Sequence, residues 1–174
     1  MAKIIRELKE NGELTNNFFS KEETHAKGIC HGISTVALIN KKGQLLIQKR
    51  SLNKKGEPGK WDLSSAGHIE SLETAIDTAI RETYEEISLE ITKEELQLLD
   101  TFLFKKVYDN AEIISHLTYL FLLEKDIDIN NIKFAKKEIS EIRYVNKEEY
   151  LQLLNNNQLV DAATYCNKLL DYIK

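Results

Sequence analysis

The most restrictive stretch of this chain is RETYEEI, residues 81–87, where three glutamates and one arginine share seven positions. Alanines and isoleucines at helical spacing predict that residues 72–87 form a helix. Between residues 62 and 90, eight acidic residues accompany a single basic one, Arg81, so pairs between neighbouring helical turns leave most of the charge uncompensated. A fold that keeps this helix therefore needs a cation beside it.

The three glutamates of this helix are predicted to point the same way. At 100° per residue, Glu82, Glu85 and Glu86 lie within one arc of about 100°, next to the apolar stripe. We expect them at the edge of the core, where partial desolvation amplifies their repulsion. A hard divalent cation such as Mg²⁺ would relieve it, since Mg²⁺ takes oxygen ligands and shares substrate phosphates. The alternative is a solvated acidic face paired with lysines.

A basic segment precedes the acidic helix. Residues 41–60 contain seven lysines and arginines and one acid, Glu57. Cations beside an acidic metal helix suit a phosphorylated ligand, because the cations can hold outer phosphates while the metal bridges the reacting ones. For Lys41, Lys42, Lys54 and Lys55, an ordinary surface loop is the alternative interpretation.

The order of predicted elements indicates an α+β fold with a mixed β-sheet sandwiched between α-helices. We expect one domain over residues 1–174, of which 1–28 is a polar lead-in with one or two strands. Residues 32–40 and 44–50 are expected to form a hairpin. The further predicted strands are 61–67, 96–108, 113–125 and 141–146, and residues 147–174 are expected to form two helices, the second with an apolar stripe that includes Cys166.

Composition limits the partners and the compartment. A net charge of −4 argues against a nucleic-acid polymer as ligand, and no apolar run approaches the roughly 20 residues that cross a bilayer. The two cysteines, Cys30 and Cys166, form no CxxC pattern, so neither a disulfide framework nor a zinc site is indicated. We expect a cytoplasmic protein that does not associate with membranes.

The spacing of glycine and charged residues resembles the Nudix box, GX5EX7REUXEEXGU with U aliphatic. Gly67, Glu73, Arg81–Glu82 and Glu85–Glu86 fall at the matching positions. Two positions depart from the pattern. Thr83 stands where an aliphatic residue is usual, and Ser88 stands where glycine ends the helix, at a cost of roughly 1 kcal/mol.

The resemblance extends over about residues 25–150. The run PGKWD with AGH, between residues 58 and 68, is similar to the Nudix branch that includes isopentenyl-diphosphate isomerase. This resemblance implies a sheet between helices with the box as a loop–helix–loop. It also implies Mg²⁺, or Mn²⁺ as an alternative, and a small-molecule diphosphate substrate. Members of this size are often dimers, so a homodimer is a candidate assembly.

Site roles follow from the resemblance. Glu82, Glu85 and Glu86 would bind the metal together with the Ala66 carbonyl. Gly67 would form a turn, Arg81 would orient the acids, and Glu73 would fix the loop. For the substrate we expect contacts from Arg50, Lys60, Trp61, Gly67 and His68. Left open are the assisting late-loop acid (Glu112, Glu138 or Glu141), the roles of His25, His31, His68 and His116, and the substrate-facing aromatic (Trp61, Tyr108 or Tyr119).

Three functions compete at this level. The first is a magnesium-dependent pyrophosphohydrolase that acts on a nucleoside diphosphate derivative or a related organic diphosphate. The second is a prenyl-diphosphate isomerase, which the histidines favour and Ala66 disfavours, because the isomerases carry a cysteine at that position. The third is a non-catalytic nucleotide-binding regulator, which the complete acid set of the box disfavours.

Overall fold

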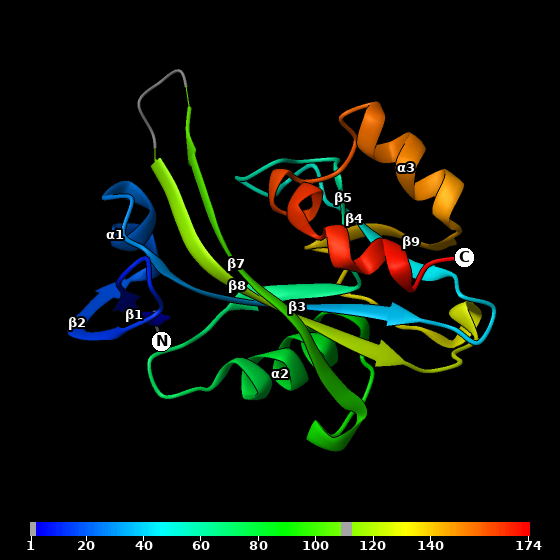
Figure 1. Cartoon of the computed structure of the whole chain (residues 1–174), viewed down its shortest axis with the longest axis horizontal. Coiled ribbons are helices and arrows are strands. Elements are labelled where there is room, and N and C mark those ends of the chain that lie inside the picture. Colours follow the sequence, from blue (N-terminus) through cyan, green and yellow to red (C-terminus); the bar gives the residue numbers. More distant parts are fainter. Residues whose placement is uncertain (1–2, 109–112) are drawn as a thin grey trace.

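The computed structural model describes residues 3–108 and 113–174, built around a curled mixed β-sheet (Figure 1). Its central strand is β3 (His31–Ile39), which runs parallel to β8 (Ile113–Glu124) over nine residue pairs. β8 also forms a long antiparallel hairpin with β7 (Leu96–Val107). On the other side of β3 lies β6 (Ser65–His68), antiparallel, with Ile33 opposite His68.

The remaining strands complete the two ends of the sheet. β4 (Leu45–Arg50) pairs with β9 (Ile139–Val145) and with the short β5 (Trp61–Asp62). At the N-terminus, β1 (Ile4–Leu8) and β2 (Leu14–Ser20) form a hairpin that is followed by α1 (Lys21–Ala26). β1 also meets β3 through the pair Glu7 and His31.

Helical elements cover both faces of the sheet, so the predicted sandwich is confirmed. α2 (Ala75–Ile87) lies on one face, and α3 (Lys147–Asn155) with the C-terminal turns lies on the other (Figure 1). The alternation of side chains along β3 supplies both cores: Val36 and Leu38 pack with α2, while Ala37 and Ile39 pack with the C-terminal elements. Three-residue 3-10 helices, η1 (Lys93–Glu95) and η2 (Ile129–Asn131), occur in the connections.

Local chemistry sets both ends of α2. Thr74 is the N-cap and forms a capping box with Asp77. Ser88 ends the helix with φ 53° and ψ 32°, the left-handed conformation that glycine adopts more readily. The helix is therefore three residues shorter at its start than the predicted 72–87, because the cap interrupts the pattern at Thr74.

Three predicted elements are wrong in detail. The second C-terminal helix is replaced by two 3-10 helices, η3 (Asp161–Tyr165) and η4 (Asn167–Asp171). Apolar residues three apart suit the 3-10 period, and no side chain caps either turn. Residues 33–50 form only the end of a hairpin, since Ile39 opposite Leu45 is the one pair joining β3 and β4. Residues 61–67 divide between β5 and β6.

Within the described part of the chain, no helix is both long and apolar enough to cross a membrane. Cys30 and Cys166 are free thiols, and Cys166 is buried in the core beneath the C-terminal turns, as its apolar stripe predicts.

Candidate functional site

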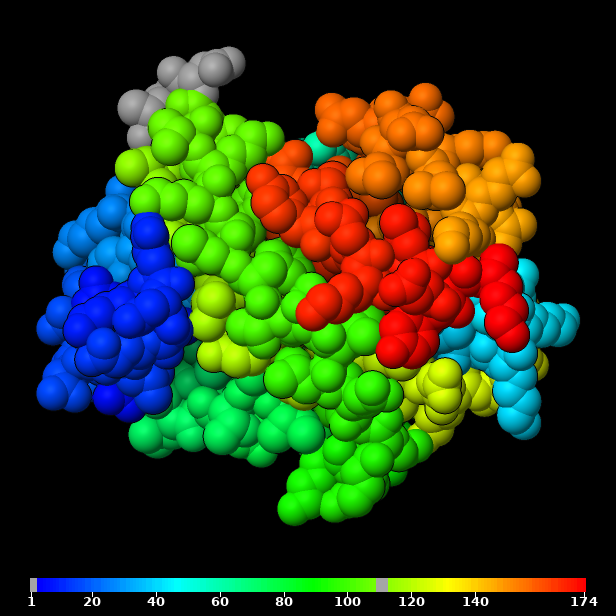
Figure 2. Space-filling view, viewed as in Figure 1, coloured from blue at the N-terminus to red at the C-terminus, as the bar shows by residue number. Residues whose placement is uncertain are grey.

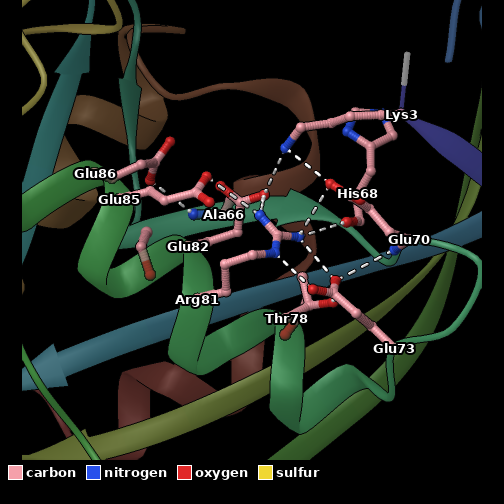
Figure 3. A network of polar contacts seen from close by, with 12 residues as sticks. Lys3, Ala66, His68, Glu70, Glu73, Thr78, Arg81, Glu82, Glu85 and Glu86 are labelled. Carbon is pink, nitrogen blue, oxygen red and sulfur yellow. Dashed lines mark hydrogen bonds and ion pairs between the residues drawn. The ribbon is translucent and has the colours of Figure 1, made fainter. Parts of the chain in front are cut away.

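Arg81, at the middle of α2, is the centre of a network of polar contacts (Figure 3). Its Nε and Nη2 donate to the two carboxylate oxygens of Glu73 at 2.6 and 2.8 Å. Its Nη1 donates to Glu82 at 2.6 Å and to Glu85 at 3.3 Å, and its Nη2 reaches the carbonyl of His68 at 3.3 Å. One guanidinium therefore joins the loop before α2 to two of the predicted metal ligands.

Glu73 is fixed by this network from several sides. Besides Arg81, the Thr78 hydroxyl donates to its carboxylate at 2.6 Å and the Glu70 backbone N–H at 3.4 Å. The hydrogen bonds from Arg81 and from Thr78 lower the pKa of Glu73 to about 2, against the opposing effect of partial burial. Glu73 is thus ionised at any physiological pH. Its carboxylate oxygens are occupied by the hydrogen bonds that hold the loop in place.

Glu86 has the opposite electrostatic character. It is 6% exposed, and its Oε2 accepts hydrogen bonds from Gln48 Nε2 at 2.8 Å and from the backbone N–H of Ala66 at 3.1 Å. Burial raises its pKa to about 8, and the neighbouring Glu82 contributes in the same direction. Without a cation, a buried carboxylate in this position is therefore energetically costly in its charged form.

The side chain of Glu82 lies directly against the backbone of Gly67. A Cβ on Gly67 would overlap the carboxyl group of Glu82, so this position excludes any side chain. The expected turn at Gly67 is wrong, since the residue lies inside β6 and outside the left-handed backbone region. Glycine is needed here for space, because it lets a carboxylate approach the strand.

These residues fit a hard divalent cation. Glu82 and Glu86 lie on the buried face of α2, while the side chain of Glu85 is 51% exposed. The prediction that all three border the core is thus correct only for Glu85, and the two others lie deeper. Carboxylate oxygens beside a strand without a side chain at Gly67 are the donor set that Mg²⁺ or Mn²⁺ prefers. The carbonyl of Ala66 is the neighbouring backbone oxygen.

The packing beneath the acids includes a hydroxyl pair. Thr83, at the position where the box has an aliphatic residue, forms a 2.8 Å hydrogen bond with Ser65, and both side chains are buried. Thr83 therefore substitutes for the aliphatic side chain and also links α2 to β6 by a polar contact.

Three lysines lie around the acids. Lys3 forms ion pairs with Glu70 at 3.2 Å and with Glu82 at 3.6 Å, and Lys54 pairs with Glu138 at 2.6 Å. Lys21 is half-buried and, within the described residues, forms no ion pair. Burial lowers its pKa, and the charges of Lys54 and Lys3 act in the same direction. Lys21 is therefore a cation beside the acids that no carboxylate of the described residues pairs with.

The expected phosphate contacts are engaged elsewhere. Arg50 donates to the carbonyl of Gly56 at 3.0 and 2.8 Å and pairs with Asp62 at 3.4 Å. Lys60 pairs with Glu57 and Asp161. Trp61 is buried in the core beneath the C-terminal turns, with the guanidinium of Arg143 4.7 Å from its ring centre. The structure therefore brings none of these three side chains to the acids of α2.

The histidines form a separate cluster. One ligand atom from each of His25, His31 and His68 lies within 4.8 Å of the others, and the Nε2 atoms of His25 and His68 are 2.8 Å apart. Nδ1 of His31 is hydrogen-bonded to the Ile29 carbonyl at 2.8 Å, and its buried Nε2 has no hydrogen-bond partner. Burial lowers the pKa of His31 to about 4 and also lowers the pKa of His68, so these two imidazoles are neutral and the cluster could also hold a metal.

Other candidates differ in their surroundings. His116 lies on β8 between His31 and Phe104, and burial lowers its pKa to about 3. Glu138 belongs to the loop that meets the end of α2, where the Ala135 N–H donates to the Glu86 carbonyl at 2.9 Å. Glu141 lies on β9, opposite Lys49 of β4. Glu112 lies outside the described residues.

The remaining aromatic candidates are placed away from the acids. Tyr119 is half-buried and packs against the core beneath α2, and Tyr108 donates to Asp161 at 3.0 Å.

Three residues beside the acids were not predicted from the sequence: Gln48, Lys3 and Lys21. A polar Gln48 inside an apolar strand was a usable signal, whereas the two lysines reach the site through the fold.

Comparison with known proteins gives one family. The NUDIX domain model matches residues 31–166. The uncharacterized Nudix hydrolase lmo0368 of Listeria monocytogenes is 34% identical over 153 residues, which are 88% of this chain and 85% of that protein. The isopentenyl-diphosphate Delta-isomerase of Pectobacterium atrosepticum is 28% identical over 83% of this chain and 78% of its own. The crystal structure of DR0079 from Deinococcus radiodurans has a TM-score of 0.72 at 21% identity, covering 91% and 92% of the two chains.

The chain belongs to the Nudix hydrolase family, since the family model spans most of it and a Nudix hydrolase matches it over nearly its whole length. The likeness to DR0079 concerns the fold. The resemblance inferred from the box is thus confirmed, and the isomerase relationship is the more distant one.

Proposed function

We propose that the protein is a magnesium-dependent Nudix pyrophosphohydrolase that cleaves the diphosphate bond of a nucleoside diphosphate derivative or a related organic diphosphate. One observation carries this proposal: Glu82 and Glu86 are buried side by side with the partly exposed Glu85, next to a strand in which Gly67 leaves room. Half-buried lysines opposite the acids suit the charge of a diphosphate.

In this proposal each residue of the site has a distinct task. Glu82, Glu85 and Glu86 hold Mg²⁺, with Mn²⁺ as an alternative, and the Ala66 carbonyl is the neighbouring backbone donor. When bound, the metal supplies charge neutralisation and polarisation of the diphosphate. Arg81 and Glu73 fix the orientation of the acids. Glu138, kept ionised because its bond to Lys54 lowers its pKa, is the late-loop acid that we propose accepts a proton from the attacking water.

The test is hydrolysis with the acids neutralised one at a time. Glu82→Gln, Glu85→Gln and Glu86→Gln should each lower turnover by on the order of a hundredfold or more, because a metal contributes several kcal/mol to transition-state stabilisation. Glu90→Gln, an exposed acid beyond the helix, is the matched control. Monophosphate or phosphate release is followed with a set of nucleoside diphosphate derivatives. Unchanged turnover of the three variants would refute the metal-ligand assignment.

The histidine cluster supports a second candidate, an isomerase acting on a prenyl diphosphate. His25, His31 and His68 bring three nitrogen ligands together, and an isopentenyl-diphosphate isomerase is among the relatives. Ala66 argues against it, because no thiol is available at that position. Isopentenyl diphosphate is therefore included in the substrate set, with double-bond migration as the readout. In either case we place the activity in the cytoplasm, where the free thiols of Cys30 and Cys166 would stay reduced.

A further inference from the structure

The N-terminal strand β1 is attached to the loop that precedes α2. The backbone N–H of Ser71 donates to the Ile4 carbonyl at 2.8 Å, Ile5 forms a bridge with Glu70, and the side chain of Ile5 is fully buried. In the space-filling view the blue N-terminal hairpin lies against the green segment of this loop (Figure 2). The backbone next to Lys3 is therefore fixed beside the acids, while its side chain is 40% exposed and can move.

Lys3 lies where a metal bound to Glu82 would compete with it for the same carboxylate. Its Nζ lies 3.6 Å from Oε1 of Glu82, the same oxygen that accepts the 2.6 Å hydrogen bond from Arg81 (Figure 3). Glu70, at 3.2 Å, is the other acid on Lys3. A divalent cation held by Glu82 would be close to this ammonium, and like charges at such separations repel strongly in a partly desolvated site.

The surrounding charges favour an anion on the side of Lys3. The backbone N–H of Lys21 donates to the Lys3 carbonyl at 3.1 Å, and the ammonium of Lys21 has no ion pair among residues 3–108 and 113–174. Lys54 is the third cation and is paired with Glu138. Once a metal holds Glu82, the released ammonium of Lys3 gains most from a ligand that carries several negative charges, and a diphosphate is such a ligand.

We propose that Lys3 is an exchangeable cation: it pairs with Glu82 in the metal-free site and transfers to the diphosphate of the substrate when metal binds. This inference rests on the proposed function and adds a substrate-binding residue to it. It makes metal and diphosphate bind cooperatively, since each favours the position of Lys3 that the other requires. A static structural ion pair between Lys3 and Glu82 would instead stabilise the fold without coupling the two ligands.

The experiment measures Mn²⁺ binding by calorimetry, with and without methylenediphosphonate, a diphosphate analogue that is not hydrolysed. In Lys3→Met, the Kd for Mn²⁺ alone should fall about threefold, because a competing cation is gone. The coupling factor between Mn²⁺ and the diphosphonate should drop by about tenfold relative to the unmodified protein. Lys3→Arg should retain coupling. Lys9→Met, on the turn between β1 and β2 and paired with Glu13 at 3.0 Å, should change neither value.

The outcomes separate the two proposals. Glu82→Gln identifies the Mn²⁺ that is held by the acids, as distinct from any held by the histidines. If the unmodified protein binds Mn²⁺ through Glu82 and couples it to diphosphonate, but Lys3→Met has the same coupling factor, the role of Lys3 is refuted and the proposed function stands. If Glu82→Gln loses no Mn²⁺, both are refuted. Thermal unfolding of Lys3→Met and Lys3→Arg checks that the variants remain folded.

Discussion

Two glutamates of the box, Glu73 and Glu86, lie in environments that shift their pKa values in opposite directions. Glu73 is surrounded by donors, and the hydrogen bonds from Arg81 lower its pKa to about 2. Glu86 is buried beside Glu82, and burial raises its pKa to about 8. The first carboxylate stabilises the folded chain as an anion, whereas the second opposes folding as an anion and needs a cation. Glu73, which fixes the loop, therefore accepts more hydrogen bonds than Glu86, which we propose as a metal ligand.

The Glu73 contact predicts a pH-dependent stability difference. Its folded pKa of about 2 lies below the ordinary value of 4.5, so its ionised form stabilises the fold above pH 4.5, and that stability is lost as pH falls from 4.5 toward 2. Glu73→Gln should lower the free energy of unfolding by on the order of 2 kcal/mol at pH 7. Urea unfolding from pH 7 to pH 2, with Glu90→Gln as control, checks this. A difference that persists undiminished at pH 2 would contradict it.

At the scale of elements, α2 is the part of the fold that the sequence specifies best. Its N-cap at Thr74 and its end at Ser88 follow from local residues, and its acids come together because their spacing matches a helix. Ser88 is the weak point. A serine held at φ 53° occupies a backbone region that L-residues with a side chain rarely adopt.

Ser88→Gly should therefore stabilise the protein by about 1 kcal/mol, because glycine reaches the left-handed conformation without the Cβ penalty. The gain is measured by urea unfolding at constant pH. Asn157→Gly is the comparison, since Asn157 has φ 55° and asparagine tolerates this region better, so its gain should be smaller. Destabilisation by Ser88→Gly would mean that the serine side chain has a contact that outweighs the strain.

Local pattern was sufficient for some elements and insufficient for others. The apolar strands β3, β7 and β8 and the acids of α2 follow from periodicity alone. The C-terminal residues 158–174 carry an equally apolar stripe but form 3-10 turns, because packing of Leu159, Cys166 and Leu169 into the core is compatible with either helix. Helix propensity could not distinguish an α-helix from 3-10 turns here, because no capping residue marks where a helix would begin.

The site was predictable where it is local in sequence. Glu73, Arg81, Glu82 and Glu86 share one helix and its preceding loop, so spacing brought them together. The cations around them were not predictable in the same way. Arg50 and Lys60 are near in sequence but contact Gly56, Glu57 and Asp161, whereas Lys3 lies just before β1, more than sixty residues from the box. The pairing of β1 with the loop at Glu70 brings Lys3 to the acids, and no local sequence pattern encodes this long-range pairing.

At the scale of the whole molecule, Asp161 joins three distant segments. Its carboxylate accepts hydrogen bonds from Lys106 and Tyr108 at the end of the β7–β8 hairpin and pairs with Lys60 at 3.6 Å. Its backbone N–H donates to Glu57 at 2.8 Å. The basic loop over residues 51–60 is thus attached to the C-terminal turns and to the hairpin through one largely buried carboxylate.

Removing that charge should loosen the loop without unfolding the protein. In Asp161→Asn, hydrogen exchange of residues 51–60 and of the end of β7 should accelerate by roughly tenfold, since the loss of a partly buried ion-pair network costs on the order of 1 kcal/mol locally. The core strands β3 and β8 should exchange as before, because their hydrophobic contacts do not involve Asp161. Asp171→Asn, an exposed acid on η4, is the control. The acceleration should shrink at high salt, which weakens the ion pairs already in the unmodified protein. Equal exchange in Asp161→Asn and Asp171→Asn would show that backbone bonds alone hold this loop in place.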